Sequence, residues 1–167
     1  MREWRRYSRT MPVVTLRPVR DGDAESMFRL ESDEVGADMI AMLPRAPGDR
    51  IAFDQHWDRT RNDVTVLNRI IECDGEFAGY AVSFLLDGQR QVGYWIERSM
   101  WGQGIASSAL GLLLKELDDR PLWGRVASDN LGSRRVLERA GFTVVGVERV
   151  LAPRRGGEVT GLVFRLG

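Results

Sequence analysis

The 167-residue sequence contains one cysteine, Cys73, one histidine, His56, and one lysine, Lys115. A single cysteine excludes a disulfide bond within the chain, which is typical of proteins in a reducing compartment, so we expect a cytoplasmic protein. Cys73 precedes an Asp74-Gly75 turn and has no neighbour in the sequence of the kind that activates a thiol, which indicates a structural residue at a strand end. We expect no metal site.

The sequence also lacks an apolar run long enough to cross a bilayer, and it has no net charge, because 24 Lys and Arg residues balance 24 Asp and Glu residues. We therefore expect neither membrane nor nucleic-acid binding. Residues 1–11 are rich in arginine and have no apolar stretch of the kind found in signal peptides. We predict a flexible N-terminal arm over residues 1–12 and a single domain over residues 13–167, present as a monomer or a homodimer.

Apolar segments separated by Gly, Pro, Asn and Asp predict seven strands and four helices. The expected strands are residues 13–17, 65–73, 76–86, 91–97, 122–127, 142–150 and 159–166, and the expected helices are residues 24–31, 50–61, 105–117 and 131–140. Asp23 is a candidate N-cap, and residues 32–49 are expected to be a loop or a broken helix. Asp74-Gly75 and Asp87-Gly88 predict antiparallel hairpins, whereas residues 91–127 predict a parallel, right-handed crossover. The fold class is therefore mixed α/β.

A glycine-rich loop, Gly102-Gln-Gly-Ile-Ala-Ser107, connects the expected strand 91–97 to the expected helix 105–117. Such a loop binds phosphate, because glycine lets the backbone approach an anion and the first-turn N–H groups of the helix are free. A Walker A loop is excluded, since no Gly-Lys-Ser or Gly-Lys-Thr is present. The dinucleotide fingerprint G-x-G-x-x-G is nearly matched, but three antiparallel strands precede the loop where that fingerprint requires the first strand of a β-α-β series.

Two motifs follow each other along the chain. The first is Gly93-Tyr-Trp-Ile followed by Trp101-Gly-Gln-Gly-Ile-Ala-Ser107, and the second is Asn130-Leu-Gly-Ser-Arg-Arg-Val-Leu-Glu-Arg-Ala-Gly-Phe142. Together they resemble the GNAT acyltransferase superfamily, and most of all its branch that acetylates the N-terminal amines of ribosomal proteins. The resemblance covers residues 13–166. It implies a GNAT-type twisted sheet of about seven strands, with a splayed parallel pair in the middle and about four flanking helices.

The same resemblance implies acetyl-CoA as the acyl-donor co-substrate, with its pantetheine arm in the gap between the splayed strands. Backbone N–H groups at Trp95 and Ile96 would polarise the thioester carbonyl. Asn130 and Ser133 would contact the pantetheine arm near the sulfur. The pyrophosphate would lie on the loop, with one bond from the Ser107 hydroxyl and with backbone N–H donors from Trp101, Gly102, Gln103, Gly104, Ile105 and Ala106.

Several of these residues also have a purely structural interpretation. Asn130 is a good N-cap for the helix that follows it, and this role is compatible with cofactor contact. Trp95 and Trp101 equally suit packing positions. Arg134 and Arg135 lie either beside the ribose phosphate of the cofactor or on a solvated helix face.

Two positions depart from the family pattern at the reacting end. Many members have a tyrosine general acid where this chain has Leu137, and some relatives have an acidic residue where it has Gln91. The general base is therefore unassigned. The candidates for catalysis are residues that titrate near neutrality or lie near the reacting atoms, namely His56, Ser133 and Asn130, followed by Glu72 and Glu97 as weaker candidates for a base.

We therefore predict an N-acetyltransferase that transfers an acetyl group from acetyl-CoA to a primary amine by direct attack within a ternary complex. The acceptor is either a protein N-terminus or a small molecule such as an aminoglycoside, a polyamine or an amino sugar. The alternative is a non-catalytic acyl-CoA-binding module of the same fold, which acts as a sensor or as a partner's subunit. The missing tyrosine and the unassigned base leave this alternative open.

Overall fold

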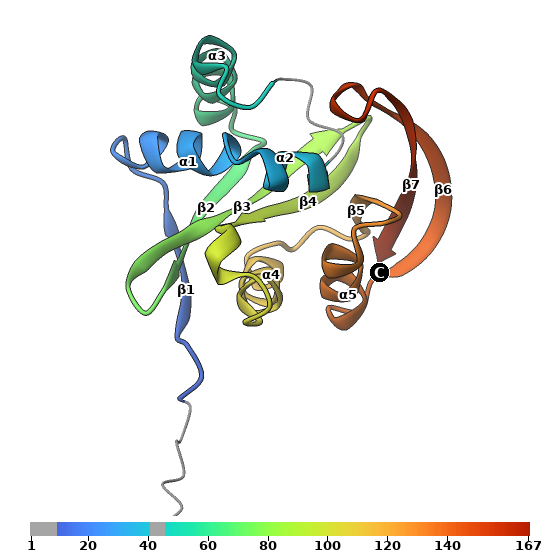
Figure 1. Cartoon of the computed structure of the whole chain (residues 1–167). Helices are drawn as coiled ribbons and strands as arrows, with labels where there is room; N and C mark the ends of the chain where they lie inside the picture. Colours follow the sequence, from blue (N-terminus) through green and yellow to red (C-terminus); the bar gives the residue numbers. More distant parts are fainter. Residues whose placement is uncertain (1–9, 41–45) are drawn as a thin grey trace, which may run out of the picture.

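A seven-stranded sheet with helices on both faces makes up the computed structural model, which describes residues 10–40 and 46–167 (Figure 1). The strand order is β1-β2-β3-β4-β5-β7-β6. The strands are β1 (Val14–Pro18), β2 (Leu67–Cys73), β3 (Glu76–Leu86), β4 (Gln89–Ile96), β5 (Leu122–Ala127), β6 (Thr143–Ala152) and β7 (Gly157–Leu166). The α-helices are α1 (Asp23–Glu31), α2 (Glu34–Ile40), α3 (Arg50–Arg61), α4 (Ile105–Lys115) and α5 (Leu131–Arg139). The predicted mixed α/β fold is confirmed.

All neighbouring strands run antiparallel except β4 and β5, which run parallel. Both predicted hairpin turns are present. Asp74 and Asp87 have φ angles of 52° and 51°, and the glycine after each also has a positive φ. Two consecutive positive φ angles give the type I′ turn, whose twist matches that of the strands it joins. The parallel pair is joined through α4, because parallel strands need a long crossover connection.

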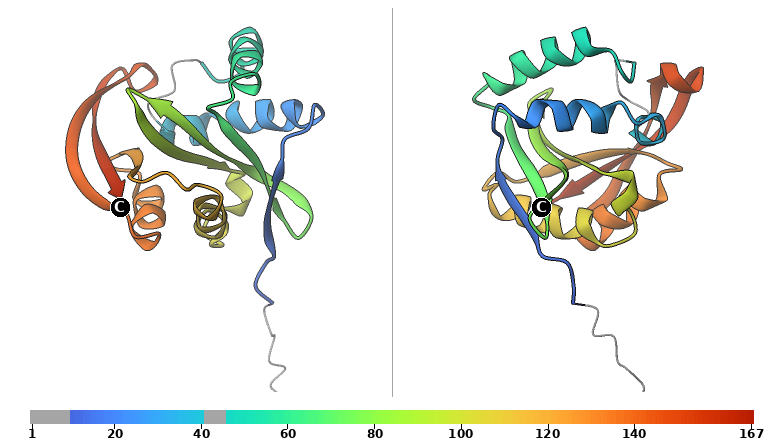
Figure 2. Two further views of the ribbon diagram at one scale, coloured as in Figure 1. Left: turned by 180° about the vertical axis from the view of Figure 1, so that it is seen from behind. Right: turned by 60° about the vertical axis from the view of Figure 1, so that its left-hand side comes forward.

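The helices form two layers. α4 and α5 lie on one side of the sheet, and α1, α2 and α3 lie on the other (Figures 1 and 2). The main hydrophobic core lies on the α4 side and includes the fully buried side chains of Leu110 and Phe164. A smaller cluster of Met27, Phe53 and Ile70 lies on the side of α1 and α3. Within residues 10–40 and 46–167, no helix has the length and apolar character needed to cross a membrane.

A close contact between β3 and β4 requires glycine at position 79. Gly79 has a φ of 151°, and a Cβ atom there would lie 1.9 Å from the carbonyl oxygen of Trp95. No side chain fits in that space, so a larger residue would force β4 away from β3. Gly79 therefore fixes the position of the segment of β4 that carries Trp95.

The predicted caps of α3 and α5 are confirmed. The Asp49 carboxylate accepts a hydrogen bond from the Ala52 N–H at 3.0 Å, before α3. After α5, Gly141 adopts a left-handed φ of 93°, and the N–H of the buried Phe142 donates to the Leu137 carbonyl at 3.1 Å. This is the glycine-terminated helix end that the sequence predicts.

Asp23 is not the N-cap of α1, contrary to the prediction. It is the first helical residue, after Gly22, and the helix start has no side-chain cap. Both carboxylate oxygens of Asp23 accept hydrogen bonds from the Arg17 guanidinium at 2.8 Å, and one also accepts from the Arg20 N–H at 2.7 Å. A bidentate charged pair is stronger than an ordinary cap, so the carboxylate is drawn to β1 instead.

The segment expected to be a loop or a broken helix contains the short helix α2, so within the described residues five α-helices flank the sheet, where about four were expected. The Asp33 carboxylate accepts from the Gly36 N–H at 2.9 Å and caps this helix. A Cβ atom at Gly36 would lie 3.2 Å from the Trp95 indole nitrogen, so α2 packs closely on β4. Tertiary packing thus stabilises a helix that lacks a clear apolar period. Residues 41–45, which include part of the expected loop, lie outside the described residues, as do residues 1–9 of the predicted arm.

Candidate active site

β4 and β5 separate soon after they begin to pair. Their last facing residues are Gln91 and Trp123, although β4 continues to Ile96. The other edge of β4 stays paired with β3 throughout, and just beyond it the Glu97 N–H donates to the Ala78 carbonyl at 2.8 Å. Because backbone groups alternate between the two edges of a strand, this register directs the N–H and C=O of Ile96 toward β5. We call this row of backbone groups, which has no strand partner after Gln91, the open edge of β4.

Trp95 lies one position earlier and faces the other way. Its carbonyl points at Gly79 on β3. Of the two residues expected to present N–H groups to a thioester, only Ile96 therefore lies on the open edge. Trp95 contributes its side chain, which is 6% exposed and packs against Leu30 of α1 and Ala37 of α2.

The glycine loop lies at the end of the open edge, after a 3₁₀ turn (Arg98–Met100), and leads into α4. Gly102 and Gly104 have φ angles of 75° and 79°, and a Cβ atom at either position would meet no other atom within 4 Å. The first bond of the α4 ladder runs from the Ser108 N–H to the Gly104 carbonyl at 3.1 Å. The N–H groups of residues 105–107 precede it, so they are available to an anion.

Trp101 joins the loop to β4 rather than adding a backbone donor. Its N–H already donates to the Arg98 carbonyl at 3.2 Å, and its indole N–H donates to the Ile96 carbonyl at 2.9 Å. The Gln103 side chain bonds within the same turn, to the Ser99 carbonyl at 3.4 Å. The backbone donors of the predicted cradle thus begin at Gly102.

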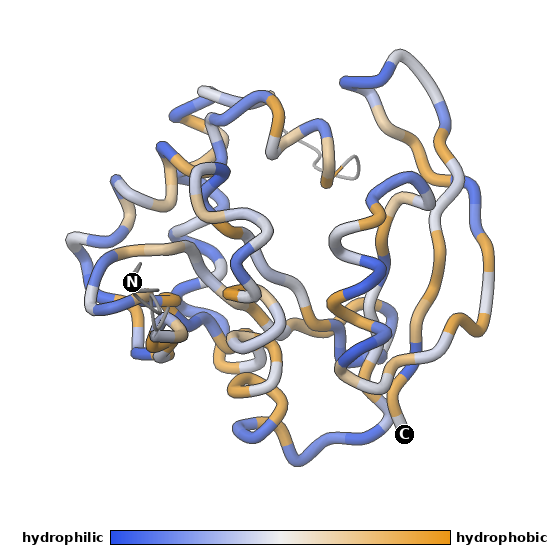
Figure 3. Tube along the Cα trace, turned by 60° about the horizontal axis from the view of Figure 1, so that its bottom comes forward, coloured by the Kyte–Doolittle hydropathy of each residue, from blue (hydrophilic) through white to orange (hydrophobic). Residues whose placement is uncertain are grey.

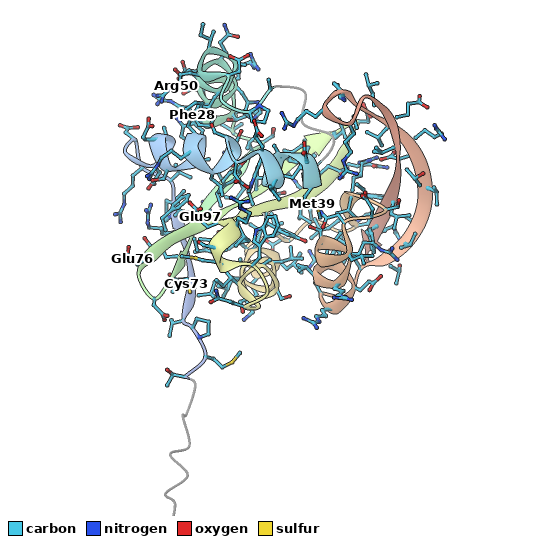
Figure 4. The ribbon with its side chains drawn as sticks, in the orientation of Figure 1. Phe28, Met39, Arg50, Cys73, Glu76 and Glu97 are labelled. Atoms are coloured by element: carbon cyan, nitrogen blue, oxygen red, sulfur yellow. The ribbon has the colours of Figure 1, made fainter. Side chains whose placement is uncertain are left out.

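The start of α5 approaches the gap between the separated ends of β4 and β5 from the β5 side. The Asn130 side-chain oxygen accepts from the Ser133 N–H at 3.1 Å, which confirms the predicted N-cap. The Asn130 side-chain nitrogen donates to the Met39 carbonyl at 3.1 Å. Figure 4 shows Met39 near the end of α2. Asn130 is 8% exposed, so it is a buried link between α5 and α2 as well as a cap.

A cavity of about 400 Å³ opens between these elements. It brings together four of the predicted site residues: His56 of α3, Trp95 of β4, and Asn130 and Ser133 at the start of α5. The glycine loop is not part of its wall. The remaining wall consists of Met39, Ile40, Tyr80, Val82, Phe84, Leu86, Gln91, Val92, Gly93, Tyr94, Arg125, Val126 and Leu137.

Tyr94 is a site residue that the sequence does not reveal. Its hydroxyl donates to the Ser133 carbonyl at 3.3 Å, across the open edge. Burial raises the pKa of Tyr94 to about 12, so the hydroxyl keeps its proton. Leu137 lies in the same cavity and is 2% exposed, which agrees with the absence of a tyrosine from α5. A tyrosine thus reaches this region from β4 instead.

The two weaker candidates for a base do not line this cavity. Glu72 is bound to the Arg17 guanidinium, and Glu97 lies beside a separate hollow with Phe28 and Arg29. His56 does line the cavity, and histidine is the side chain that ordinarily takes up a proton near neutral pH. Within the described part of the chain, no three His, Cys, Asp or Glu side chains are placed to hold a metal ion.

Ion pairs bridge the two sides of the gap. The β6–β7 hairpin stands apart from β1–β4, on the side of the C-terminus (Figure 3). At its tip, Arg154 donates to the Asp38 carboxylate of α2 at 2.9 Å. Arg155 donates to the Asp38 carbonyl at 2.6 Å and to the Asp129 carboxylate at 2.7 Å. α2 is therefore held over the gap from two directions, by Asn130 and by this hairpin tip.

The chain is also similar to known proteins. A family model described as the acetyltransferase (GNAT) domain matches residues 14–143. The chain belongs to the GNAT acetyltransferase family. The predicted superfamily is confirmed, and the open edge of β4 is the feature that the predicted fold required.

Solved structures similar to this GNAT chain include ribosomal-protein acetyltransferases. RimJ from Mycobacterium smegmatis, solved with CoA-disulfide, shares 26% identity with a TM-score of 0.71, over 92% of this chain and 81% of RimJ. RimL, a ribosomal L7/L12 α-N-protein acetyltransferase solved with coenzyme A, shares 20% identity with a TM-score of 0.75, over 92% of this chain and 93% of RimL. The spermidine N-acetyltransferase of Vibrio cholerae, solved with CoA and spermine, has a TM-score of 0.77 at 16% identity, over 92% of this chain and 94% of that enzyme. No curated protein matches this GNAT chain in sequence.

Proposed function

We propose that the chain transfers an acetyl group from acetyl-CoA to a primary amine by direct attack of the amine on the thioester. The open edge of β4 carries the proposal. It ends at a helix N-terminus suited to phosphate, and it runs past a cavity large enough for an acceptor. The similarity in fold to RimJ, which was solved with CoA-disulfide and shares 26% identity with this chain, supports coenzyme A as the ligand.

The residues fit the cofactor at both ends. The space above Gly102 and Gly104 is clear, and the first-turn N–H groups of α4 give a pyrophosphate its donors. The Ser107 hydroxyl stands in the same turn. Along the open edge, an extended pantetheine arm has a row of backbone donors and acceptors to pair with, as an added strand would. When bound, acetyl-CoA supplies an activated acyl carbon.

The Ile96 N–H is the donor placed for the acyl carbonyl oxygen. This N–H belongs to a strand that stays paired with β3, and the indole N–H of Trp101 donates to the carbonyl of the same residue, Ile96. A donor of this kind does not need to reorganise when negative charge develops on the oxygen. Loss of one such donor costs an enzyme about 100- to 1,000-fold in rate.

The chemistry also requires two proton movements. As the amine nitrogen bonds to the acyl carbon, the carbon–sulfur bond breaks, the amine loses a proton and the leaving sulfur gains one. Tyr94 and Ser133 lie together beside the gap, where the resemblance would put the cofactor sulfur, and we assign the protonated Tyr94 hydroxyl as the donor that stabilises the leaving thiolate. On the wall, His56 is our candidate to accept the proton from the amine.

A thiol-release assay tests the proposal. The protein is mixed with acetyl-CoA and a panel of amines that includes spermidine, amino sugars and peptides with different first residues. Free CoA thiol should appear with at least one acceptor. Cys73 is buried in the folded chain and its thiol pKa is raised by that burial, so it adds little background. CoA binding without thiol release from any amine would overturn the transferase and leave a CoA-binding module.

A further inference from the structure

Two side chains of the cavity wall carry donors without acceptors. Gln91 is the last residue of β4 that still faces β5, so it lies where the gap begins to open. It shares a face of the sheet with Phe84, its partner on β3, and with Trp95. Gln91 is 2% exposed, and its side-chain nitrogen has no hydrogen-bond partner in residues 10–40 and 46–167.

Arg125 approaches the same place from β5. The residue before it, Gly124, faces Leu137 of α5, with only 3.2 Å between that side chain and the position of a Cβ atom. Because side chains alternate along a strand, Arg125 lies on the opposite face, which is that of Gln91. Both residues line the cavity.

Two of the three Arg125 guanidinium nitrogens are engaged. Nη2 donates to the Gln89 side-chain oxygen at 3.3 Å, and Nε pairs with the Glu148 carboxylate at 3.3 Å. Nη1 is buried and has no partner among the described residues. An unmatched buried donor is rare in folded proteins and carries a desolvation penalty. Here two of them line one cavity, and they come from strands that pair only beside it.

We propose that Gln91 and Arg125 form a subsite for an oxygen-bearing group of the acceptor, a carboxylate or a carbonyl, and that this subsite selects such acceptors over polyamines. The inference rests on the proposed transfer to an amine. A polyamine offers only donors, so it would leave both nitrogens unmatched. A carboxylate offers two oxygens and can satisfy one nitrogen with each.

The surrounding charges favour an anionic group. Glu148 offsets Arg125, but Arg165 on β7 faces the same side of the sheet, next to Trp123, with its guanidinium carbon 5.8 Å from the indole. These three side chains, two arginines and one carboxylate, together carry one positive charge. The rest of the wall near Gln91 is apolar, with Val82, Phe84 and Leu86 at every second position of β3, so it suits an extended carbon chain between the two ends.

The strand sets the length of a matching acceptor. Gln91 lies four residues before Trp95, a separation of about 13 Å along β4. The Gln91 side chain shortens this span, so the oxygen should lie on the order of 10 Å from the reacting amine. 8-Aminooctanoate has this reach. 8-Aminooctanamide has a neutral carbonyl in place of the carboxylate, and octylamine has a methyl group there. The three amines therefore differ only in whether the far end carries a carboxylate, a carbonyl or no oxygen.

The test compares these three amines in wild type and in Gln91→Leu. Leucine fills a similar volume and removes the unmatched nitrogen, so the variant should unfold at the same urea concentration as wild type or a higher one. In wild type, kcat/KM should be about tenfold higher for the two oxygen-bearing amines than for octylamine. Gln91→Leu should remove most of that preference through KM. The exposed Gln55 on α3, changed to Leu, is the matched control and should retain it.

Arg125→Lys is a second probe, because it keeps a charge beside Glu148 and removes Nη1. It should lower the preference in the same direction. Equal kcat/KM for all three amines in wild type, or an unchanged preference in both Gln91→Leu and Arg125→Lys, would overturn the subsite.

Calorimetry with octanoate separates this inference from the transferase itself, because octanoate carries the oxygen group but no amine. It should bind the CoA-loaded protein, and more weakly in Gln91→Leu. If no amine is acetylated but octanoate binds in this way, the transferase fails and the subsite stands. If amines are acetylated but octanoate binds wild type and Gln91→Leu equally, the subsite fails and the transferase stands.

Discussion

The hydroxyl of Tyr94 on β4 donates a hydrogen bond to the backbone carbonyl of Ser133 on α5, at 3.3 Å. The two residues are 39 positions apart in the chain and belong to elements on opposite sides of the β4–β5 gap. Their contact crosses the place where a pantetheine arm would end. A ligand sulfur there would compete with the Ser133 carbonyl for the Tyr94 proton.

Tyr94→Phe tests that arrangement. The variant keeps the ring and loses the hydroxyl, so CoA affinity should stay within about twofold while kcat falls by about 100- to 1,000-fold, the range of a lost charge-stabilising donor. Because the pKa of Tyr94 is raised to about 12, wild type should show no loss of activity from its ionisation at pH 7 to 9. Tyr80→Phe, on the same cavity wall, is the control for the loss of a tyrosine hydroxyl. An unchanged kcat in Tyr94→Phe would remove Tyr94 from the mechanism.

Position 104 allows the effect of a negative charge on the loop to be tested with two side chains of the same size. Its φ of 79° strains most residues, but Asn and Asp tolerate this region and have the same size. Gly104→Asp should weaken CoA binding by at least tenfold relative to Gly104→Asn, because it adds a carboxylate where the pyrophosphate would lie. Fluorescence or calorimetric titration with CoA measures the difference. Equal affinities would show that the phosphates bind elsewhere.

The predictable part of this molecule is local in the sequence. The hairpins follow from Asp74-Gly75 and Asp87-Gly88, and the α5 cap follows from Asn130, because each of these signals acts within a few residues. The glycine loop and its helix likewise lie within one motif. The seven strands and the parallel crossover are therefore predictable from the sequence.

The unpredicted part depends on contacts between distant segments. The sequence shows Asp23 at a helix start but not Arg17 folding onto it from β1. It shows neither which face of β4 Tyr94 occupies nor that Gln91 and Arg125 line the same cavity. The helix α2 has weak periodicity and is held by Trp95 and the β6–β7 tip, so local patterning could not define it.

Gly79 should be the least replaceable glycine of the sheet. Gly79→Ala places a Cβ atom 1.9 Å from the Trp95 carbonyl oxygen, whereas Gly75→Ala, also at positive φ (85°), meets no atom within 4 Å. Both positions have a positive φ that disfavours alanine, but only Gly79 adds a clash with another strand. Gly79→Ala should be less stable than Gly75→Ala by at least about 2 kcal/mol in urea unfolding. Its CoA affinity should also fall, since β4 carries the open edge. Similar stabilities would mean that β3 and β4 separate easily at this point.

Arg17, Asp23 and Glu72 form the most enclosed charged cluster in the described chain, with exposed side-chain fractions of 20%, 12% and 24%. It joins β1, α1 and β2. The hydrogen bonds from Arg17 hold the pKa of Asp23 below its ordinary value of 3.8, and they outweigh the opposing effect of burial. A carboxyl with a lowered pKa stabilises the folded state above its unfolded pKa, and this contribution is lost as the pH falls.

Asp23→Asn should therefore destabilise the protein at pH 7, by about 2 kcal/mol, because it leaves part of the Arg17 charge unmatched. The gap between wild type and variant should narrow as the pH falls below about 4, where the unfolded Asp23 takes up a proton first. Urea unfolding at a series of pH values measures both quantities. Asp21→Asn is the control, because the Asp21 side chain is fully exposed and lies 3.8 Å from its nearest arginine. A constant gap from pH 7 to pH 3 would mean that Asp23 acts through its shape and not through its charge.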